Sequence, residues 1–217
     1  MNRTSRLLLS SALLAALALP AMPVLAHDCP HDTATTAAPK LEQTRAVLRD
    51  LWVGHAFWVR DVVEQTLAGN TAAAAEAEKQ VVANARQIAG AIEPFYGKPA
   101  SDRLFGLLTG HYGAVKQYLE AAKARSTAKQ DAATKALTDN AGEIAVFLSG
   151  ANPNLPLDTL RGLLLAHGGH HIQQITQLRD KQYAQEAETW AAMKDHMYVI
   201  ADALAGALAK QFPAKFA

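Results

Sequence analysis

Three histidines recur at one interval along this chain. His55, His111 and His167 are spaced 56 residues apart, although the whole chain of 217 residues contains only 8 histidines. A neutral imidazole can ligate a metal, exchange a proton or form a hydrogen bond. The regular spacing therefore predicts either a shared metal or cofactor site, or one structural polar position that is copied three times.

Other side chains extend this pattern. His171 follows His167 by one helical turn and is expected on the same face. Asn84, Asn140 and His196 are also spaced 56 residues apart. The candidate metal ligands are His55, His111, His167, His171 and His196, with Met197, Asn84 and Asn140 as secondary candidates.

Each histidine and its partner lie equally far from a turn. The dipeptide Gly69-Asn70 is halfway between His55 and Asn84. In an antiparallel hairpin, both side chains would lie at one height, about 20 Å from the turn at 1.5 Å per residue. We therefore expect three level pairs, His–Asn, His–Asn and His–His, in one polar layer across the core.

Helices must carry these residues. The chain is rich in alanine and other helix-forming residues and shows no sustained apolar–polar alternation. Leu48, Leu51, His55 and Trp58 follow three- and four-residue steps. The sequence predicts an all-α fold, a six-helix bundle built from three tandem αα-hairpin repeats, at about 41–97, 98–153 and 154–216. The third helix is expected to begin at Ser101 or Asp102.

The N-terminal segment has the features of a secretory signal peptide. Arg3 and Arg6 precede the apolar stretch Leu7–Leu19, and cleavage is expected after Ala26. No other stretch predicts an integral membrane span. We expect a soluble periplasmic or secreted protein with residues 1–26 as signal peptide, 27–40 as a flexible arm and 41–217 as a single helical domain.

Composition and motifs exclude several classes of function. The 21 basic and 20 acidic residues give no electrostatic case for binding nucleic acid. No GxSxG, HExxH, P-loop or dinucleotide-binding motif is present, so a non-enzymatic role is favoured. Cys29 is the only cysteine and cannot form an intrachain disulfide, but it can stay free, pair between chains or bind a metal.

The arm offers a second candidate site. After cleavage, the terminal amine and imidazole of His27 would chelate copper(II), with Cys29 or His31 as a further ligand. The competing interpretation is an ordinary polar tail.

A histidine layer with methionine and few carboxylates favours copper or zinc over calcium, magnesium or a di-iron centre. The leading hypothesis is an exported metal-binding protein for metal handling, storage or sensing. An alternative is a non-catalytic helical scaffold or interaction module whose histidines are structural. A third is b-type haem bound through His/His or His/Met axial ligands. The absence of CxxCH excludes covalent c-type haem.

Short motifs also carry a resemblance. The chain contains LRDLWxxH at 48–55, HM at 196–197, AD at 201–202 and KQFPAKF at 210–216. Over about residues 45–216 it resembles an uncharacterised group of exported bacterial helical proteins. The resemblance implies one helical domain and, with no established activity in the group, no catalytic residues.

Overall fold

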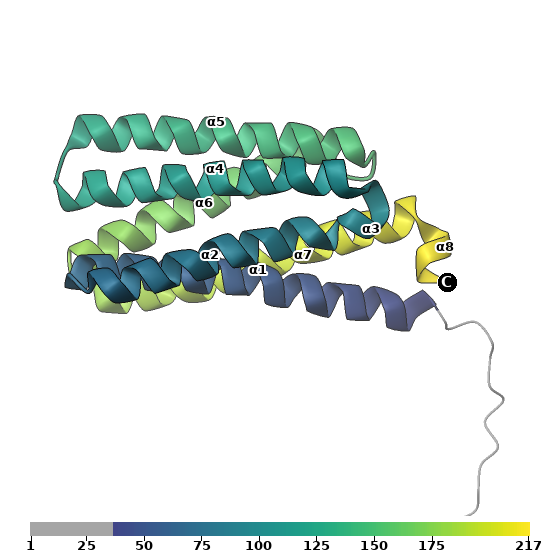
Figure 1. Cartoon of the computed structure of the whole chain (residues 1–217), viewed down its shortest axis with the longest axis horizontal. Coiled ribbons are helices and arrows are strands. Elements are labelled where there is room, and N and C mark those ends of the chain that lie inside the picture. Colours follow the sequence, from purple (N-terminus) through teal and green to yellow (C-terminus); the bar gives the residue numbers. More distant parts are fainter. Residues whose placement is uncertain (1–36) are drawn as a thin grey trace, which may run out of the picture. The chain divides into compact units, whose positions relative to one another are not determined.

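The computed structural model describes residues 37–217, and all the regular structure in this range is helical (Figure 1). The all-α class is thus confirmed. The six long helices are α1 (Ala37–Ala68), α2 (Thr71–Ala91), α4 (Lys98–Lys123), α5 (Thr127–Ala151), α6 (Leu157–Arg179) and α7 (Tyr183–Gln211). Two single-turn helices are α3 (Glu93–Tyr96) and α8 (Pro213–Phe216). None of the helices in this range is long and apolar enough to cross a membrane.

Two helix boundaries differ from the prediction. α1 begins at Ala37, so the end of the expected arm is helical. α4 begins at Lys98, with Pro99 in its first turn, and not at Ser101 or Asp102. Ser101 is buried, and the Asp102 carboxylate accepts a hydrogen bond from Lys98, so neither residue caps the helix. Proline suits the first turn because the amide there has no intrahelical acceptor.

The turn of each hairpin contains one residue in the left-handed conformation. Gly69 has a φ of 81°, Arg125 a φ of 53° and Lys181 a φ of 59°. These three residues follow α1, α4 and α6, and they are again spaced 56 residues apart. A left-handed residue directly after a helix reverses the chain and satisfies its last carbonyls. The same turn geometry therefore recurs in all three hairpins, with glycine in only one of them.

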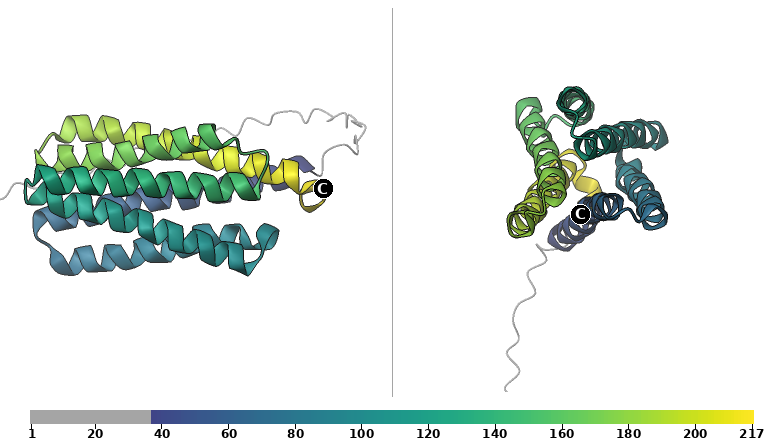
Figure 2. Two further views of the ribbon diagram at one scale, coloured as in Figure 1. Left: turned by 90° about the horizontal axis from the view of Figure 1, so that it is seen from above. Right: turned by 90° about the vertical axis from the view of Figure 1, so that its left-hand side faces the viewer.

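The long helices form a closed ring. Each contacts the next one along the chain, and α7 contacts α1. Figure 2 shows the helices end-on, grouped around a common centre. α1, α4 and α6, the first helices of the three hairpins, also contact one another. These three helices therefore line the centre of the bundle, whereas α2, α5 and α7 lie between them on the outside.

The inner helices carry a polar layer between two apolar clusters. On α1, Leu48 belongs to one buried cluster and Val62 to the other, with the buried His55 between them in sequence. The same order holds on α4 and α6. Apolar packing on both sides excludes water, so polar atoms in this layer must find partners within it.

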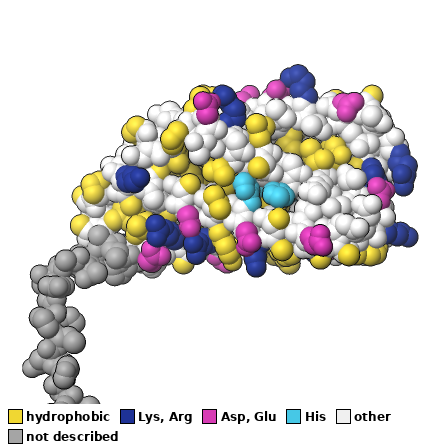
Figure 3. All heavy atoms as spheres, turned by 180° about the vertical axis from the view of Figure 1, so that it is seen from behind, with side chains coloured by type: hydrophobic (Ala, Val, Ile, Leu, Met, Phe, Trp, Pro, Cys, Tyr) yellow, Lys and Arg dark blue, Asp and Glu magenta, His cyan; other side chains and the backbone are white. Residues whose placement is uncertain are grey.

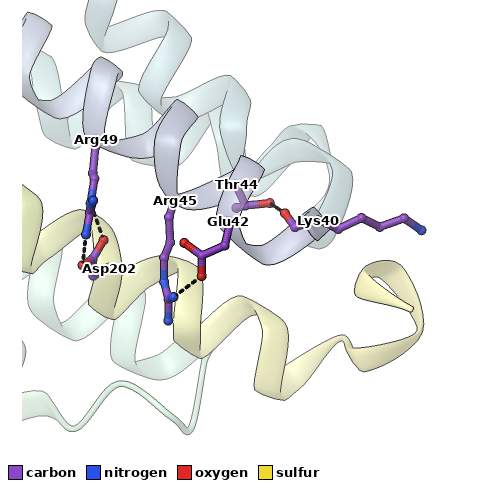
Figure 4. Close-up of polar contacts among 6 residues, drawn as sticks. All are labelled: Lys40, Glu42, Thr44, Arg45, Arg49 and Asp202. Carbon is purple, nitrogen blue, oxygen red and sulfur yellow. Dashed lines mark hydrogen bonds and ion pairs between the residues drawn. The ribbon is translucent and has the colours of Figure 1, made fainter. Parts of the chain in front are cut away.

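Two ion pairs join α1 to α7 beside this core. Arg49 forms a bidentate pair with Asp202, with N–O distances of 2.7 and 2.6 Å (Figure 4). Arg60 forms a second with Glu186, at 2.7 and 2.8 Å, and Gln174 donates a further hydrogen bond of 3.0 Å to Glu186. The Glu186 side chain is only 3% exposed, whereas that of Asp202 is 35% exposed.

This difference in burial predicts unequal effects of removing each arginine. Arg60→Met leaves a buried carboxylate without its cation and should lower the free energy of unfolding by about 3–5 kcal/mol. The matched variant Arg49→Met leaves a solvated carboxylate and should cost less than about 1 kcal/mol. Urea denaturation of both variants at pH 7.5 measures the difference. Equal losses would contradict the assignment of Glu186 as a buried charge.

Candidate metal centre

Four histidines from the three inner helices meet in the polar layer. His55 comes from α1, His111 from α4, and His167 and His171 from α6. Each offers a ring nitrogen, and these four atoms all lie within 4.8 Å of one another. All four side chains are buried, with at most 3% exposure. The structure therefore places four potential nitrogen ligands around one point in the core.

His167 lies at the middle of this cluster. Its ring centroid is 4.5 Å from that of His171, 5.4 Å from that of His111 and 5.5 Å from that of His55. The Nε2 atoms of His167 and His171 are 3.2 Å apart. Two nitrogens bound tetrahedrally to one ion at 2.0–2.1 Å would be about 3.3 Å apart. The two α6 rings are hydrogen-bonded to each other through these atoms, and their spacing also matches one edge of a tetrahedral site.

Unpaired polar atoms concentrate in this layer. Among the described residues, His55 Nδ1, His111 Nε2 and His167 Nδ1 have no hydrogen-bond partner. The indole nitrogen of Trp52, whose ring meets those of His55 and His167 edge-on, also has none. Burying a polar group without a partner costs about 1–3 kcal/mol. The protein thus bears an energetic cost, which an ion would offset at those ring nitrogens that coordinate it.

Asn140 orients the His111 ring. Its amide donates a 3.1 Å hydrogen bond to the carbonyl of Leu107, and this bond turns its Oδ1 toward Nδ1 of His111, also at 3.1 Å. Because Oδ1 can only accept, Nδ1 carries the proton and the unpaired Nε2 carries the lone pair. Ligating histidines characteristically donate their second nitrogen to a carbonyl in this way. Asn140 is therefore a positioning residue for His111.

Glycines let the asparagines approach the inner helices. A Cβ atom added to Gly54 would lie 3.2 Å from Nδ2 of Asn84, and one added to Gly110 would lie 3.2 Å from Nδ2 of Asn140. Asn84 donates to the carbonyl of Leu51 at 3.0 Å, which matches the contact of Asn140 with α4. Glycine at these positions permits a close approach of side chain to backbone.

Burial keeps the histidines neutral. Desolvation lowers the pKa of His55 to about 3, with a further lowering by nearby His111, and it lowers the pKa of His111 to about 4 against the raising effect of Asn140. The pKa values of His167 and His171 are also well below the usual range, chiefly through desolvation and then through the neighbouring histidines. All four rings are therefore neutral at neutral pH, and each keeps a lone pair on one ring nitrogen.

Among the described residues, only one of the three predicted level pairs forms a hydrogen bond. His111 meets Asn140, but His55 Nδ1 and Asn84 Oδ1 both lack partners among the described residues. His196 lies outside the four-histidine group, and its Nε2 donates to the carbonyl of Leu163 at 2.8 Å.

Met197 and the histidines and cysteine of the arm are the remaining predicted candidates. Met197 is fully buried and packs in the apolar cluster that contains Leu48. His27, Cys29 and His31 lie outside the described residues.

Two sets of ring contacts in and near this layer were not predicted from the sequence. Trp52 borders two of the ring systems, and His170 lies against His196 with ring centroids 5.5 Å apart. The motif LWxxH at 51–55 places Trp52 one turn before His55, which was the available signal.

Comparisons with protein-family models, with curated proteins and with solved structures find no match to this chain. The geometry of the cluster and the chemistry of its side chains therefore carry the functional argument.

Proposed function

We propose that this is an exported metal-binding protein that holds copper or zinc in the four-histidine cluster. The observation that carries this proposal is the convergence of His55, His111, His167 and His171, buried and with ring nitrogens within 4.8 Å of one another. Its role is metal handling, storage or sensing, because a closed shell of four protein ligands leaves no coordination position for a substrate. Export depends on the signal peptide expected at residues 1–26.

The donor atoms favour copper or zinc. Imidazole suits both metals, whereas calcium and magnesium require oxygen ligands. The group of four contains no carboxylate to neutralise an ion in this dry layer. Since the cost of burying an ion rises steeply with its charge, copper(I) fits the neutral cage better than a divalent ion. We therefore expect copper(I) to be held more tightly than zinc(II).

The packing argues against haem. The centroids of the four rings lie 4.5–6.3 Å apart in every direction across the layer. A porphyrin between two axial histidines would have to displace the other two rings and the inner helices that carry them.

A structural role for the histidines has support at two positions, where His111 bonds to Asn140 and where His167 bonds to His171. The unpaired nitrogens of His55 and His111 favour the metal-binding role over it.

We infer further that the three hairpins are copies of one unit. In each, a side chain of the outer helix bonds to a carbonyl of the inner helix 33 residues earlier: Asn84 to Leu51, Asn140 to Leu107 and His196 to Leu163. The left-handed turn residues have the same spacing. Copying one histidine-bearing hairpin three times is a simple route to a cluster at the centre of a ring.

Titration of the purified full chain with copper(I) or zinc(II) tests the proposal. We expect one ion per chain at the cluster. The free energy of unfolding should rise by about 3 kcal/mol when the free ion is at 100 times the dissociation constant. A Cys29→Ser background removes the thiol of the arm as a competing ligand. A chain that binds neither ion, with an unchanged melting temperature, would overturn the proposal.

Asn140 gives a more specific prediction. Asn140→Leu removes the acceptor that orients His111 and should weaken metal affinity by about 10- to 100-fold. Asn84→Leu is the matched control and should have a smaller effect, since Oδ1 of Asn84 contacts no ring nitrogen. Affinity is measured by competition with a coloured chelator. Equal effects of the two variants would show that Asn140 does not act through His111.

A further inference from the structure

A second pair of histidines lies beside the buried cluster. His170 on α6 and His196 on α7 have ring centroids 5.5 Å apart. This spacing falls within the 4.5–6.3 Å range of the rings in the four-histidine cluster. Unlike those rings, both are partly exposed, and Figure 3 shows histidine side chains at the surface of one face of the bundle.

The hydrogen bonds of His196 leave one nitrogen free for an ion. Its Nε2 is 2.8 Å from the carbonyl of Leu163 and must donate, since a carbonyl only accepts. The lone pair of the neutral ring is therefore on Nδ1. His170 contributes a second imidazole from the neighbouring helix. Two imidazoles form a small and weak docking site for a soft ion such as copper(I).

The pair also borders the buried site. His170 is adjacent in sequence to His171 and one turn from His167, both of which belong to the cluster. His196 occupies the position at which Asn140, in the second hairpin, contacts the buried His111. The two partly exposed rings thus lie on α6, which also carries His167 and His171, and on α7, which packs against α6.

We propose that His170 and His196 form the entrance through which the ion reaches the buried cluster. This inference rests on the proposed function and adds a route to it. The cluster is at most 3% exposed, so an ion needs a path through the ring of helices. Passage from two surface imidazoles to the His167–His171 pair replaces one nitrogen ligand by another and keeps the ion ligated. No electron transfer or bond cleavage accompanies this ligand exchange.

An entrance and a binding site differ in what they control. An entrance changes the rates of loading and release, whereas a binding site changes the equilibrium affinity. His196→Asn places at position 196 the residue that the other hairpins have there, so the fold should be retained. His170→Gln keeps a polar side chain at the surface. The double variant, in the full chain with Cys29→Ser, should load and release copper(I) about tenfold more slowly, with equilibrium affinity within about threefold of the parent chain. The matched control is Gln173→Ala, an exposed position one turn from His170.

Loading is followed as the loss of colour of a copper(I)–chelator complex, and release as its return. Slow loading and release with retained affinity would support the entrance. Loading rates equal to those of the parent chain would overturn it. So would a fall in stoichiometry from two ions to one with unchanged rates, which would make the pair an independent site. A parent chain that takes up no copper would overturn the proposed function, and the entrance with it.

Discussion

The metal-free protein should lose at least about 4 kcal/mol of unfolding free energy between pH 7.5 and pH 5. The four buried histidines are the cause. Their pKa values in the folded chain lie below the unfolded value of 6.5, at about 3 for His55 and about 4 for His111, and lower than usual for His167 and His171. Below pH 6.5 the unfolded chain takes up protons that the folded chain cannot. His55 and His111 then each favour unfolding by about 2 kcal/mol at pH 5, and His167 and His171 act in the same direction.

The direction and limits of this effect follow from the same shifts. Stability is greatest above pH 6.5, falls as the pH drops through that value, and levels off only near the folded pKa values. A domain of this size has a typical stability of about 5–15 kcal/mol, so the metal-free protein should be near unfolding at pH 5. A bound ion competes with protons for the same lone pairs and should move the transition to lower pH.

Urea denaturation at pH 7.5, 6.5, 5.5 and 5, with and without copper(I), measures the effect. His170→Gln is the control, because it removes a partly exposed histidine and should leave the profile nearly unchanged. Constant stability from pH 7.5 to 5 in the metal-free protein would mean that the four rings are hydrated, contrary to the burial described above.

The second large effect is expected from His55→Leu, which should abolish metal binding while stabilising the metal-free fold. The His55 ring has an unpaired Nδ1 within an apolar surrounding. Leucine of similar volume removes this buried polar atom and should raise the unfolding free energy by about 1–3 kcal/mol at pH 7.5. The gain should increase by about 2 kcal/mol at pH 5, where one protonating histidine fewer opposes folding. Metal affinity should fall by more than about 100-fold. This loss is larger than the one expected for Asn140→Leu, which removes only a residue that orients a ligand.

His111→Leu provides the matched comparison. It removes the same kind of side chain from the same layer, but it leaves Oδ1 of Asn140 buried without its partner. We therefore expect metal binding to be lost in both variants but the metal-free fold to be stabilised only by His55→Leu. If His55→Leu weakened the metal-free fold, His55 would be a structural residue with a hydrogen bond in solution, and the metal-binding role would lose its main support.

The sequence was sufficient to predict that histidines from three hairpins share one layer. Helical rise is constant, so the equal spacing of His55, His111 and His167 translates directly into equal height in an antiparallel bundle. His171 was predicted to share the face of His167 for a similar reason. The all-α class followed from composition and periodicity.

The sequence could not predict which helix of each hairpin lies inside the ring. Both helices of a hairpin carry a polar residue at the level of the layer. The spacing of these residues along the chain does not distinguish the inner helix from the outer helix. Because α7 is an outer helix, His196 bonds to a backbone carbonyl of the inner helix and lies outside the four-histidine group. The pairing of Arg60 with Glu186 was equally unpredictable, since it joins residues 126 positions apart.

The closed ring has a consequence for the order of folding. Contacts within each hairpin involve short chain separations and can form early, whereas the α1–α7 contact joins residues as distant as Arg49 and Asp202, 153 positions apart. Such long loops close late and slow the rate of folding. The four histidines come from all three hairpins, so the set is complete only when all three hairpins have packed together. Metal capture should therefore be the last event of folding, and a bound ion should slow the reopening of the ring more than it speeds the closure.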